Sequence, residues 1–238
     1  MTEPDKSLLV VARDTPVTIP EMILGYADGH SKVMGQDPTP QCLAVEVAHG
    51  CLEAGNGKKL KNFALGNVKW SPDWDGWWCM YACDERAVPV VAQAWLKDPR
   101  AYLKSDDNAD GTWTVGFKPD HPQTRFRAFP SLAKGAEEQV KFFLRDRYRE
   151  AWRQCYGGHA DAFVRALGKA GYFTANVDTY AKAVVLISAS LLEPCSNALL
   201  GRHHPLGDDL VARVDTLVTE SLYDPARRDL RLVEDLVT

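Results

Sequence analysis

The sequence predicts an α+β protein that is mostly helical, with a small β-rich lobe between two helical parts. Apolar side chains recur at helical spacing before residue 55 and after residue 130. Residues 58–130 are instead rich in Trp, Gly, Pro and Asp and contain short alternating stretches. Helices, then strands, then helices are typical of an α+β fold with a cleft between two lobes.

The first helical part is expected to begin after a loosely tied arm, residues 1–18. Apolar residues at helical spacing predict a helix over residues 20–34. Thr39 as N-cap and Pro40 at the first helical position begin a second helix, which ends at about Ala54 before two glycines.

The middle segment is expected to form the β-rich lobe. Residues 77–83 and 112–117 alternate as short strands, and residues 90–103 between them are predicted to form a helix.

The helical pattern returns at Ser131, which is predicted to cap a helix. Lys134, Glu137 and Glu138 are expected on the outer face of that helix. Further helices are predicted over residues 160–170 and 177–192, and Pro194 is expected to end the second of them.

The composition excludes several functional classes. The 28 basic and 32 acidic residues give a formal charge of −4, which argues against a partner such as nucleic acid. The longest apolar stretch, residues 183–192, is shorter than the about 20 residues that span a bilayer, so we expect no membrane insertion. The six cysteines are too few for a disulfide scaffold in 238 residues, and we expect buried reduced thiols.

Glu53 is the most informative acidic residue, because it lies in the last turn of an otherwise apolar helix. The helix dipole and partial burial both disfavour a carboxylate there, so the acid is expected to stay protonated near neutral pH. A general acid for a glycosidic leaving group requires this property. Gly55 and Gly57 remove side-chain bulk beside it, so a polymer could approach closely. A solvated glutamate near a helix end is the alternative interpretation.

Four short blocks follow one another along the chain. They read Ala-His-Gly-Cys-Leu-Glu-Ala-Gly-Asn-Gly over residues 48–57, Asn-Phe-Ala-Leu-Gly-Asn-Val-Lys over 62–69, Phe-Arg-Ala-Phe-Pro-Ser over 126–131, and Ala-Gly-Tyr-Phe-Thr over 170–174, followed by Tyr180-Ala181. In this order they resemble motifs of the glucosaminidase family of peptidoglycan hydrolases, which includes the flagellar muramidase domain and bacterial autolysins.

The resemblance covers about residues 40–190 and implies a lysozyme-like fold with Glu53 as the catalytic acid. The catalytic domain would then span residues 19–192, and residues 193–238 would form a C-terminal helical extension. The implied substrate is the β-1,4-linked glycan of peptidoglycan, cut on the reducing side of N-acetylglucosamine. No cofactor is implied.

A second carboxylate is expected in the β-rich lobe. Alternation along the predicted strand places Glu85 on the face of Tyr81, toward the cleft. Glu85 also resembles a strand-borne Glu of the family, although Cys83 stands where the family usually has Thr. Asp84 is the alternative, because a bulge would exchange the two faces. The distance between the carboxyl groups would distinguish a retaining, an inverting and a substrate-assisted mechanism, and the sequence leaves these open.

Four of the seven tryptophans lie in one short segment, residues 70–78. Sugar rings pack their apolar faces on aromatic planes. We expect Trp78 inside the lobe and at least one of Trp70, Trp74 and Trp77 exposed to bind glycan, although a small lobe also uses Trp as core. The other residues predicted to bind substrate are Asn67, Tyr81 and Tyr172, the last of which matches the family's Gly-Tyr block.

The sequence predicts no metal site. Residues 106–111 match the first half of a calcium loop but lack its closing glutamate, so a polar turn is the better interpretation. Cys79 and Cys83 on one strand would stand about 13 Å apart, too far for one zinc ion.

A peptidoglycan hydrolase of the N-acetylglucosaminidase type is therefore expected. The alternatives are a lytic transglycosylase on the same fold and a non-catalytic glycan-binding component of a phage tail or secretion apparatus. The acidic N-terminus does not read as a signal peptide. We therefore expect synthesis in the cytoplasm and delivery to the cell wall by a phage or a Sec-independent secretion system. The C-terminal helices are a candidate surface for a delivery or inhibitor partner.

Overall fold

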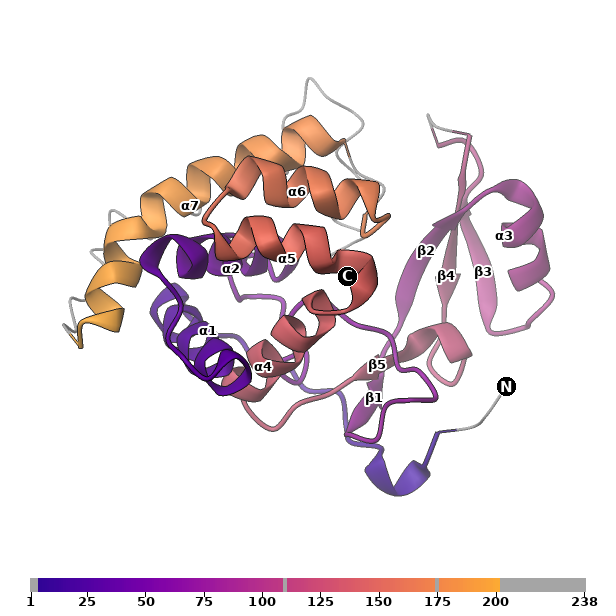
Figure 1. Cartoon of the computed structure of the whole chain (residues 1–238). Helices are drawn as coiled ribbons and strands as arrows, with labels where there is room; N and C mark the ends of the chain where they lie inside the picture. The colour runs from indigo at the N-terminus through magenta and orange to yellow at the C-terminus, as the bar shows by residue number, and fades with distance from the viewer. Residues whose placement is uncertain (1–3, 109–110, 174–175, 202–238) are drawn as a thin grey trace.

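The computed structural model describes residues 4–108, 111–173 and 176–201, and these form an α+β structure. Six helices gather in one lobe, and the strands with one further helix lie beside them (Figure 1). The coarse fold class predicted from the sequence is therefore confirmed for the described residues. None of the helices in these ranges combines the length and the apolar composition that a membrane span needs.

The helical lobe is built around α2 (Pro40–Glu53), in which every residue from Cys42 to Glu53 is buried. As predicted, the Thr39 side chain caps this helix by accepting a hydrogen bond from the Cys42 amide, and Pro40 is its first residue. α2 packs mainly on α7, and α1 packs mainly on α4. The other helices of the lobe are α1 (Ile19–Met34), α4 (Leu132–Phe143), α5 (Arg149–Tyr156), α6 (Ala160–Lys169) and α7 (Val177–Leu199).

The strands form two small antiparallel sheets. One pairs β1 (Trp78–Met80) with β5 (Arg125–Arg127), and the other has the order β2-β4-β3. The elements of the second sheet are β2 (Cys83–Ala87), β3 (Ala101–Ser105) and β4 (Trp113–Phe117), and α3 (Pro89–Trp95) contacts β2 and β4. Short 3-10 turns occur at Lys6–Leu8, Pro122–Thr124 and Asp146–Tyr148.

The N-terminal arm is held more firmly than the sequence predicts. The Val10 amide donates to the carbonyl of Trp78, and the Thr15 amide donates to the carbonyl of Leu60, each at 2.9 Å. The Arg13 amide bonds to the side chain of Asn62 at 2.9 Å. Backbone hydrogen bonds therefore tie the arm to the segment that joins the two lobes.

The predicted helix over residues 90–103 is wrong in its second half. The helix ends at Trp95, and Ala101–Ser105 form the edge strand β3. Asp98 precedes Pro99, and a residue before proline is disfavoured in helical geometry. The Asp98 side chain instead accepts from the Arg100 amide at 2.9 Å, which turns the chain into the strand.

The predicted strand over residues 77–83 is also divided. The Tyr81 amide bonds to the carbonyl of Thr124, after which the chain leaves the first sheet and enters β2 of the second. Because the chain changes sheet here, the alternation of side chains does not continue from β1 into β2. The two faces predicted for residues 77–85 are therefore valid only within each short strand.

Helix α7 continues past Pro194, where the sequence predicts its end. It runs to Leu199 and so crosses the boundary proposed after Leu192. Leu191 and Cys195 on either side of the proline are fully buried. Their packing offsets the one backbone hydrogen bond that a proline inside a helix removes. The C-terminal helices predicted beyond residue 201 lie outside the described residues.

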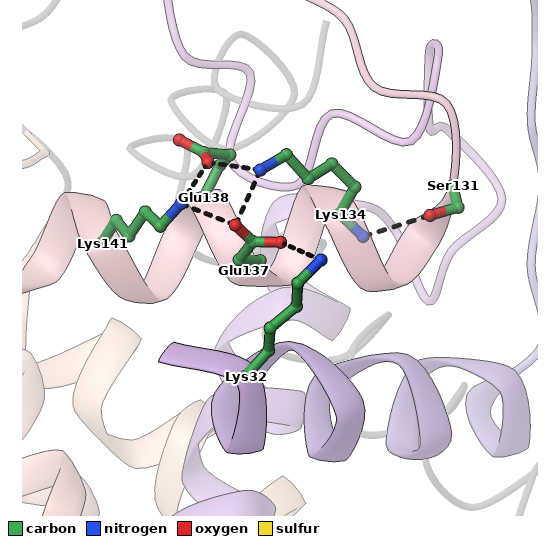
Figure 2. A network of polar contacts seen from close by, with 6 residues as sticks. All are labelled: Lys32, Ser131, Lys134, Glu137, Glu138 and Lys141. Carbon is green, nitrogen blue, oxygen red and sulfur yellow. Dashed lines mark hydrogen bonds and ion pairs between the residues drawn. The ribbon is translucent and has the colours of Figure 1, made fainter. Parts of the chain in front are cut away.

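Glu137 of α4 is not on an outer face, in contrast to the prediction. Its side chain is 6% exposed. It forms ion pairs with Lys134 and Lys141 of its own helix and with Lys32 of α1 (Figure 2). Burial works against its charge, but the lysines outweigh burial and lower the pKa of Glu137 to about 2. The packing of α4 on α1 therefore encloses a carboxylate whose charge is neutralised on three sides.

Candidate active site

Glu53, the last residue of α2, is almost enclosed. Its side chain is 4% exposed, and the phenol of Tyr180 on α7 donates a hydrogen bond of 2.6 Å to Oε1. Burial raises the pKa of Glu53 to about 7, against the opposing effect of the Tyr180 hydrogen bond. The carboxyl group therefore holds a proton for a substantial fraction of the time at neutral pH.

His49 lies one helical turn before Glu53 and faces the same oxygen. Its Nε2 is 3.6 Å from Oε1 of Glu53, beyond hydrogen-bond distance. Burial lowers the pKa of His49 to about 3, so its ring is neutral at physiological pH. The histidine therefore packs beside the acid without supplying a positive charge that would remove its proton.

An aromatic wall lies around His49 and Tyr180, the two side chains beside this acid. The ring of Tyr172 lies 5.4 Å from that of His49, and the ring of Tyr180 stacks on Phe173 at 4.6 Å. A side chain on Gly66 would come within 3.1 Å of the Tyr172 hydroxyl, so the loop of residues 62–69 approaches the same place. Glu53 and Tyr172, which the sequence places in separate blocks, are thus brought into one region.

The chain beyond Glu53 turns in a left-handed conformation. Gly55, Asn56 and Gly57 have φ of 52°, 56° and 79°. A Cβ on Gly57 would lie 2.3 Å from the carbonyl oxygen of Val17. The space beside Gly57 is therefore filled by the N-terminal arm, and the prediction that this glycine admits a polymer is wrong.

Glu85 lies on β2 and forms an ion pair with Lys69, whose Nζ is 2.5 Å from Oε1. The lysine also donates to the carbonyl of Gln123 at 2.6 Å and lies 4.0 Å from the ring centre of Phe126. Both charged side chains are about one-third exposed, at 33% for Glu85 and 37% for Lys69. Glu85 is therefore an accessible carboxylate with a fixed cation beside it.

Asp84, the alternative second carboxylate, pairs with Lys104 of β3. Adjacent side chains of a strand point to opposite faces, so Asp84 and Glu85 lie on opposite faces of the sheet.

Tyr81 and Asn67, both predicted to bind substrate, contact each other. The Tyr81 hydroxyl donates to Oδ1 of Asn67 at 3.0 Å, and its ring stacks on Phe126 at 4.1 Å. The ammonium group of Lys69 also lies over the ring of Phe126. This half-buried group links the loop of residues 62–69 to the β lobe.

The tryptophans divide as predicted. Trp78 is 3% exposed and donates through its indole to the carbonyl of Asp5, whereas Trp77 is 44% exposed. Trp70 and Trp74 are half-buried. The guanidinium of Arg127 lies 4.4 Å from the ring centre of Trp74.

A hollow of about 510 Å³ lies between residues 73–77 and α4. Trp74 and Trp77 line it, together with four basic side chains and three acidic ones. Neither Glu53 nor Glu85 lines this hollow, so the exposed aromatic surface and the two predicted acids do not share one cavity. The charged residues that line it are Asp73, Asp75, Arg127, Lys134, Glu138, Lys141 and Arg145.

The segment that resembles a calcium loop connects β3 with β4, as the polar-turn interpretation requires. Residues 109 and 110 lie outside the described ranges. Ser105 donates to Asp107 at 2.6 Å, and Asn108 donates to Thr114 at 2.9 Å, so these side chains are used within the turn. All six cysteines are buried free thiols, as predicted.

The sequence patterns did not assign three of the groups that shape the site: Tyr180, His49 and Lys69. All three stand inside the blocks that resemble the family, and His49 is also one helical turn before the acid. Their positions in these blocks could have marked them as candidates. Their contacts with Glu53 and Glu85 depend on the packing, which the sequence does not show.

Comparison of the chain with protein-family models, with curated proteins and with solved structures finds no match. The described residues define an α+β protein with a buried acid at the end of its central helix. Any activity must therefore be argued from the residues of this site.

Proposed function

We propose that the protein is a peptidoglycan hydrolase of the N-acetylglucosaminidase type, with a lysozyme-like arrangement and Glu53 as general acid. The observation that carries the proposal is the enclosed carboxyl group of Glu53, whose pKa is raised to about 7. Protonation of a glycosidic oxygen requires an acid that keeps its proton near the working pH.

Tyr180 has a positioning role in this proposal. Its hydroxyl donates to Oε1 of Glu53, so that oxygen is occupied as an acceptor and the acid proton belongs on Oε2. A fixed phenol thereby selects which oxygen delivers the proton to the sugar.

Glu85 is the proposed second carboxylate. It activates water, or it stabilises the positive charge that develops on the sugar ring or on an oxazolinium formed by the 2-acetamido group. Its partial exposure supports this role, and Lys69 holds its position. The side chain of Asp84 is only 11% exposed and is paired with Lys104, whereas that of Glu85 is 33% exposed, which favours Glu85 over Asp84.

Access to Glu53 is a necessary step of the proposed reaction. Because only 4% of its side chain is exposed, a glycan reaches the acid only after neighbouring side chains move. Tyr172, whose pKa is raised by burial and by the nearby Glu53 charge, is partly exposed, and we expect it to move while Tyr180 keeps its hydrogen bond to the carboxyl group.

The test is cleavage of purified peptidoglycan sacculi by the wild-type protein and by Glu53→Gln. General acids contribute about 10²–10⁴-fold, so we expect a loss of this size with glycan binding retained. Glu150→Gln, on the exposed side of α5, is the matched control and should keep full activity. Full activity of Glu53→Gln would contradict the proposal.

The products separate hydrolysis from lytic transglycosylation. Hydrolysis leaves a reducing N-acetylglucosamine end, whereas a transglycosylase leaves an anhydro sugar and consumes no water. Reducing-end analysis of the digested sacculi therefore decides between these two enzymes on one fold.

A non-catalytic glycan-binding component is the second candidate, and the enclosure of Glu53 favours it. The exposed Trp77 and the half-buried Trp74 line a hollow that excludes both predicted acids. In this case the wild-type protein binds sacculi without cleaving them, and Trp77→Ala weakens binding.

The route to the cell wall stays a prediction. Delivery by a phage or a Sec-independent system is proposed, and the C-terminal helices proposed to bind a partner include residues beyond 201, which the structure does not describe. Cell fractionation that finds the protein at the wall would support this delivery. A protein that stays permanently in the cytosol would contradict it.

A further inference from the structure

A cluster of three metal-ligating side chains lies inside the helical lobe. His30 comes from α1, and Cys42 and Glu46 come from the same face of α2, four residues apart. All three are buried, and their ligand atoms lie within 4.8 Å of one another. Nδ1 of His30 is 3.0 Å from Oε1 of Glu46.

A fourth group joins the cluster from α5. The thiol of Cys155 is near that of Cys42, since Cys155 lowers the pKa of Cys42 and Cys42 raises that of Cys155, and it is close enough to Glu46 for that charge to raise its pKa as well. Cys155 is 1% exposed. Helices α1, α2 and α5 thus each point a potential metal ligand toward one place in the core.

The polar atoms of this cluster are only partly satisfied. Nε2 of His30 and Oε2 of Glu46 are buried and have no hydrogen-bond partner among the described residues. An unpaired polar atom in an apolar interior costs about 1–3 kcal/mol, so it requires an explanation. A cation would provide Oε2 of Glu46 with the partner that the protein does not.

A small cavity adjoins the cluster. It has a volume of about 10 Å³ and is lined by Glu46 and Cys155, among other residues. His30 and Cys42 do not line this space, so it lies beside the cluster, and the donor atoms would close around the ion itself. The interior therefore has both the donor atoms and a space beside them.

We infer that His30, Cys42, Glu46 and Cys155 bind a structural zinc ion. Tetrahedral zinc lies about 2.0–2.3 Å from nitrogen, oxygen and sulfur ligands, which places neighbouring ligands about 3.3–3.8 Å apart. The three preformed ligands reach this arrangement by approaching one another by about 1 Å. Thiolate and imidazole donors favour zinc over calcium or magnesium.

The protons balance in a simple way. Zinc binds thiolates, a neutral imidazole and a carboxylate, so binding releases the thiol protons of Cys42 and Cys155 and any proton that His30 shares with Glu46. No oxidant or reductant is required. Because all four ligands are protein groups and buried, the ion holds α1, α2 and α5 together and offers no open position for a substrate.

The inference is independent of the proposed glycosidase activity. The test begins with the full chain, purified under reducing conditions without chelator and incubated with zinc or cobalt(II). Elemental analysis should find one zinc ion per chain. The cobalt form should show the thiolate charge-transfer absorption and the intense visible bands of a tetrahedral site with two cysteine ligands.

Cys42→Ser and Cys155→Ser are the variants that remove one sulfur each. Each should weaken zinc binding by at least about tenfold and reduce the cobalt charge-transfer band by half. Cys79→Ser, which changes a fully buried thiol in the β lobe, is the matched control and should leave binding unchanged.

A thermal measurement covers the case in which a variant folds poorly. A strong chelator should lower the unfolding midpoint of the wild-type protein and of Cys79→Ser. If the wild-type protein binds no stoichiometric zinc, or if its midpoint is unaffected by the chelator, the inference is overturned. A disulfide between Cys42 and Cys155 in the protein isolated under reducing conditions would also overturn it.

Discussion

Glu53 shows how a single residue is adapted to its neighbours. Glu53 is the last residue of α2, and burial favours the protonated form of its carboxyl group. The Tyr180 phenol donates a hydrogen bond to one of its two oxygens. The pKa of about 7 is the balance of these effects, because burial raises it and the Tyr180 hydrogen bond lowers it. Removing either effect should move the pKa in a known direction.

Tyr180→Phe removes only the hydrogen bond. Since this bond stabilises the charged form, the pKa of Glu53 should rise further in the variant. The proposed acid must be protonated to act, so the alkaline limb of the pH–activity profile should shift to higher pH. A hydrogen bond to a charged group contributes about 1.5–3 kcal/mol, which corresponds to a shift of about one to two pH units.

The control for this shift is Tyr102→Phe, which alters a tyrosine that is 41% exposed on β3. Its profile should match that of the wild-type protein. An alkaline limb that stays in place in Tyr180→Phe, or moves to lower pH, would contradict the positioning role of Tyr180.

The same pKa predicts how stability depends on pH. The pKa of Glu53 rises from its ordinary value of 4.5 to about 7 on folding, so the folded state binds more protons than the unfolded state between these values. The free energy of unfolding should therefore fall as the pH rises through this window. This enclosed carboxylate costs the protein stability above pH 7.

Glu53→Gln should remove that cost, because a glutamine still accepts the Tyr180 hydrogen bond and carries no charge. At pH 8 the variant should be more stable than the wild-type protein by roughly 2–3 kcal/mol, with little difference at pH 4.5. Urea unfolding at the two pH values measures this. A variant that is equally destabilised at both pH values would show that the carboxyl group has no raised pKa.

At the scale of elements, the end of α2 depends on the N-terminal arm. Gly57→Ala adds a Cβ that would lie 2.3 Å from the Val17 carbonyl oxygen, at a φ of 79°. Gly35→Ala, at the end of α1, has a similar φ of 72°, but no atom of the residues that the structure describes lies within 4 Å of the added Cβ. Both variants carry the backbone strain, and only Gly57→Ala also displaces the arm.

We therefore expect Gly35→Ala to lower the free energy of unfolding by about 1 kcal/mol and Gly57→Ala by roughly 2–4 kcal/mol. Chemical unfolding of both variants provides the comparison. Equal losses of stability would mean that the N-terminal arm does not pack against this turn. Such a result would disagree with the backbone hydrogen bonds that hold residues 4–18.

Local signals predicted the helices well where side chains alone decide. Thr39 and Ser131 cap α2 and α4 as their sequence positions indicate. The pattern failed where packing decides: α7 continues through Pro194 because Leu191 and Cys195 are buried beside it. Helix α5 was not predicted, since only three of its eight residues are buried and the rest are mostly polar.

At the scale of the whole molecule, the change in composition along the chain, from helical periodicity to a segment rich in Trp, Gly, Pro and Asp and back, predicted the two lobes. The contacts of the candidate site could not be predicted in this way. Tyr180 meets Glu53 across 127 positions, and His30, Cys42 and Cys155 come from three helices. Such contacts depend on how whole helices pack, and no local pattern encodes them.

Burial was the least predictable property of the site. The sequence predicts an acid beside an open groove, whereas the structure leaves only 4% of the Glu53 side chain exposed. The exposure of a helix end depends on every element that packs over it, here including α7, whose Tyr180 contacts Glu53. Enclosure strengthens the raised pKa and makes movement of the wall part of the proposed reaction.

The most direct measurement is the titration of the Glu53 carboxyl carbon by NMR, with Glu53→Gln to identify its signal. A midpoint near 7 is expected, because burial favours the protonated acid. A midpoint near 4.5, the ordinary value for glutamate, would show that Glu53 is ionised at neutral pH and would contradict its role as general acid.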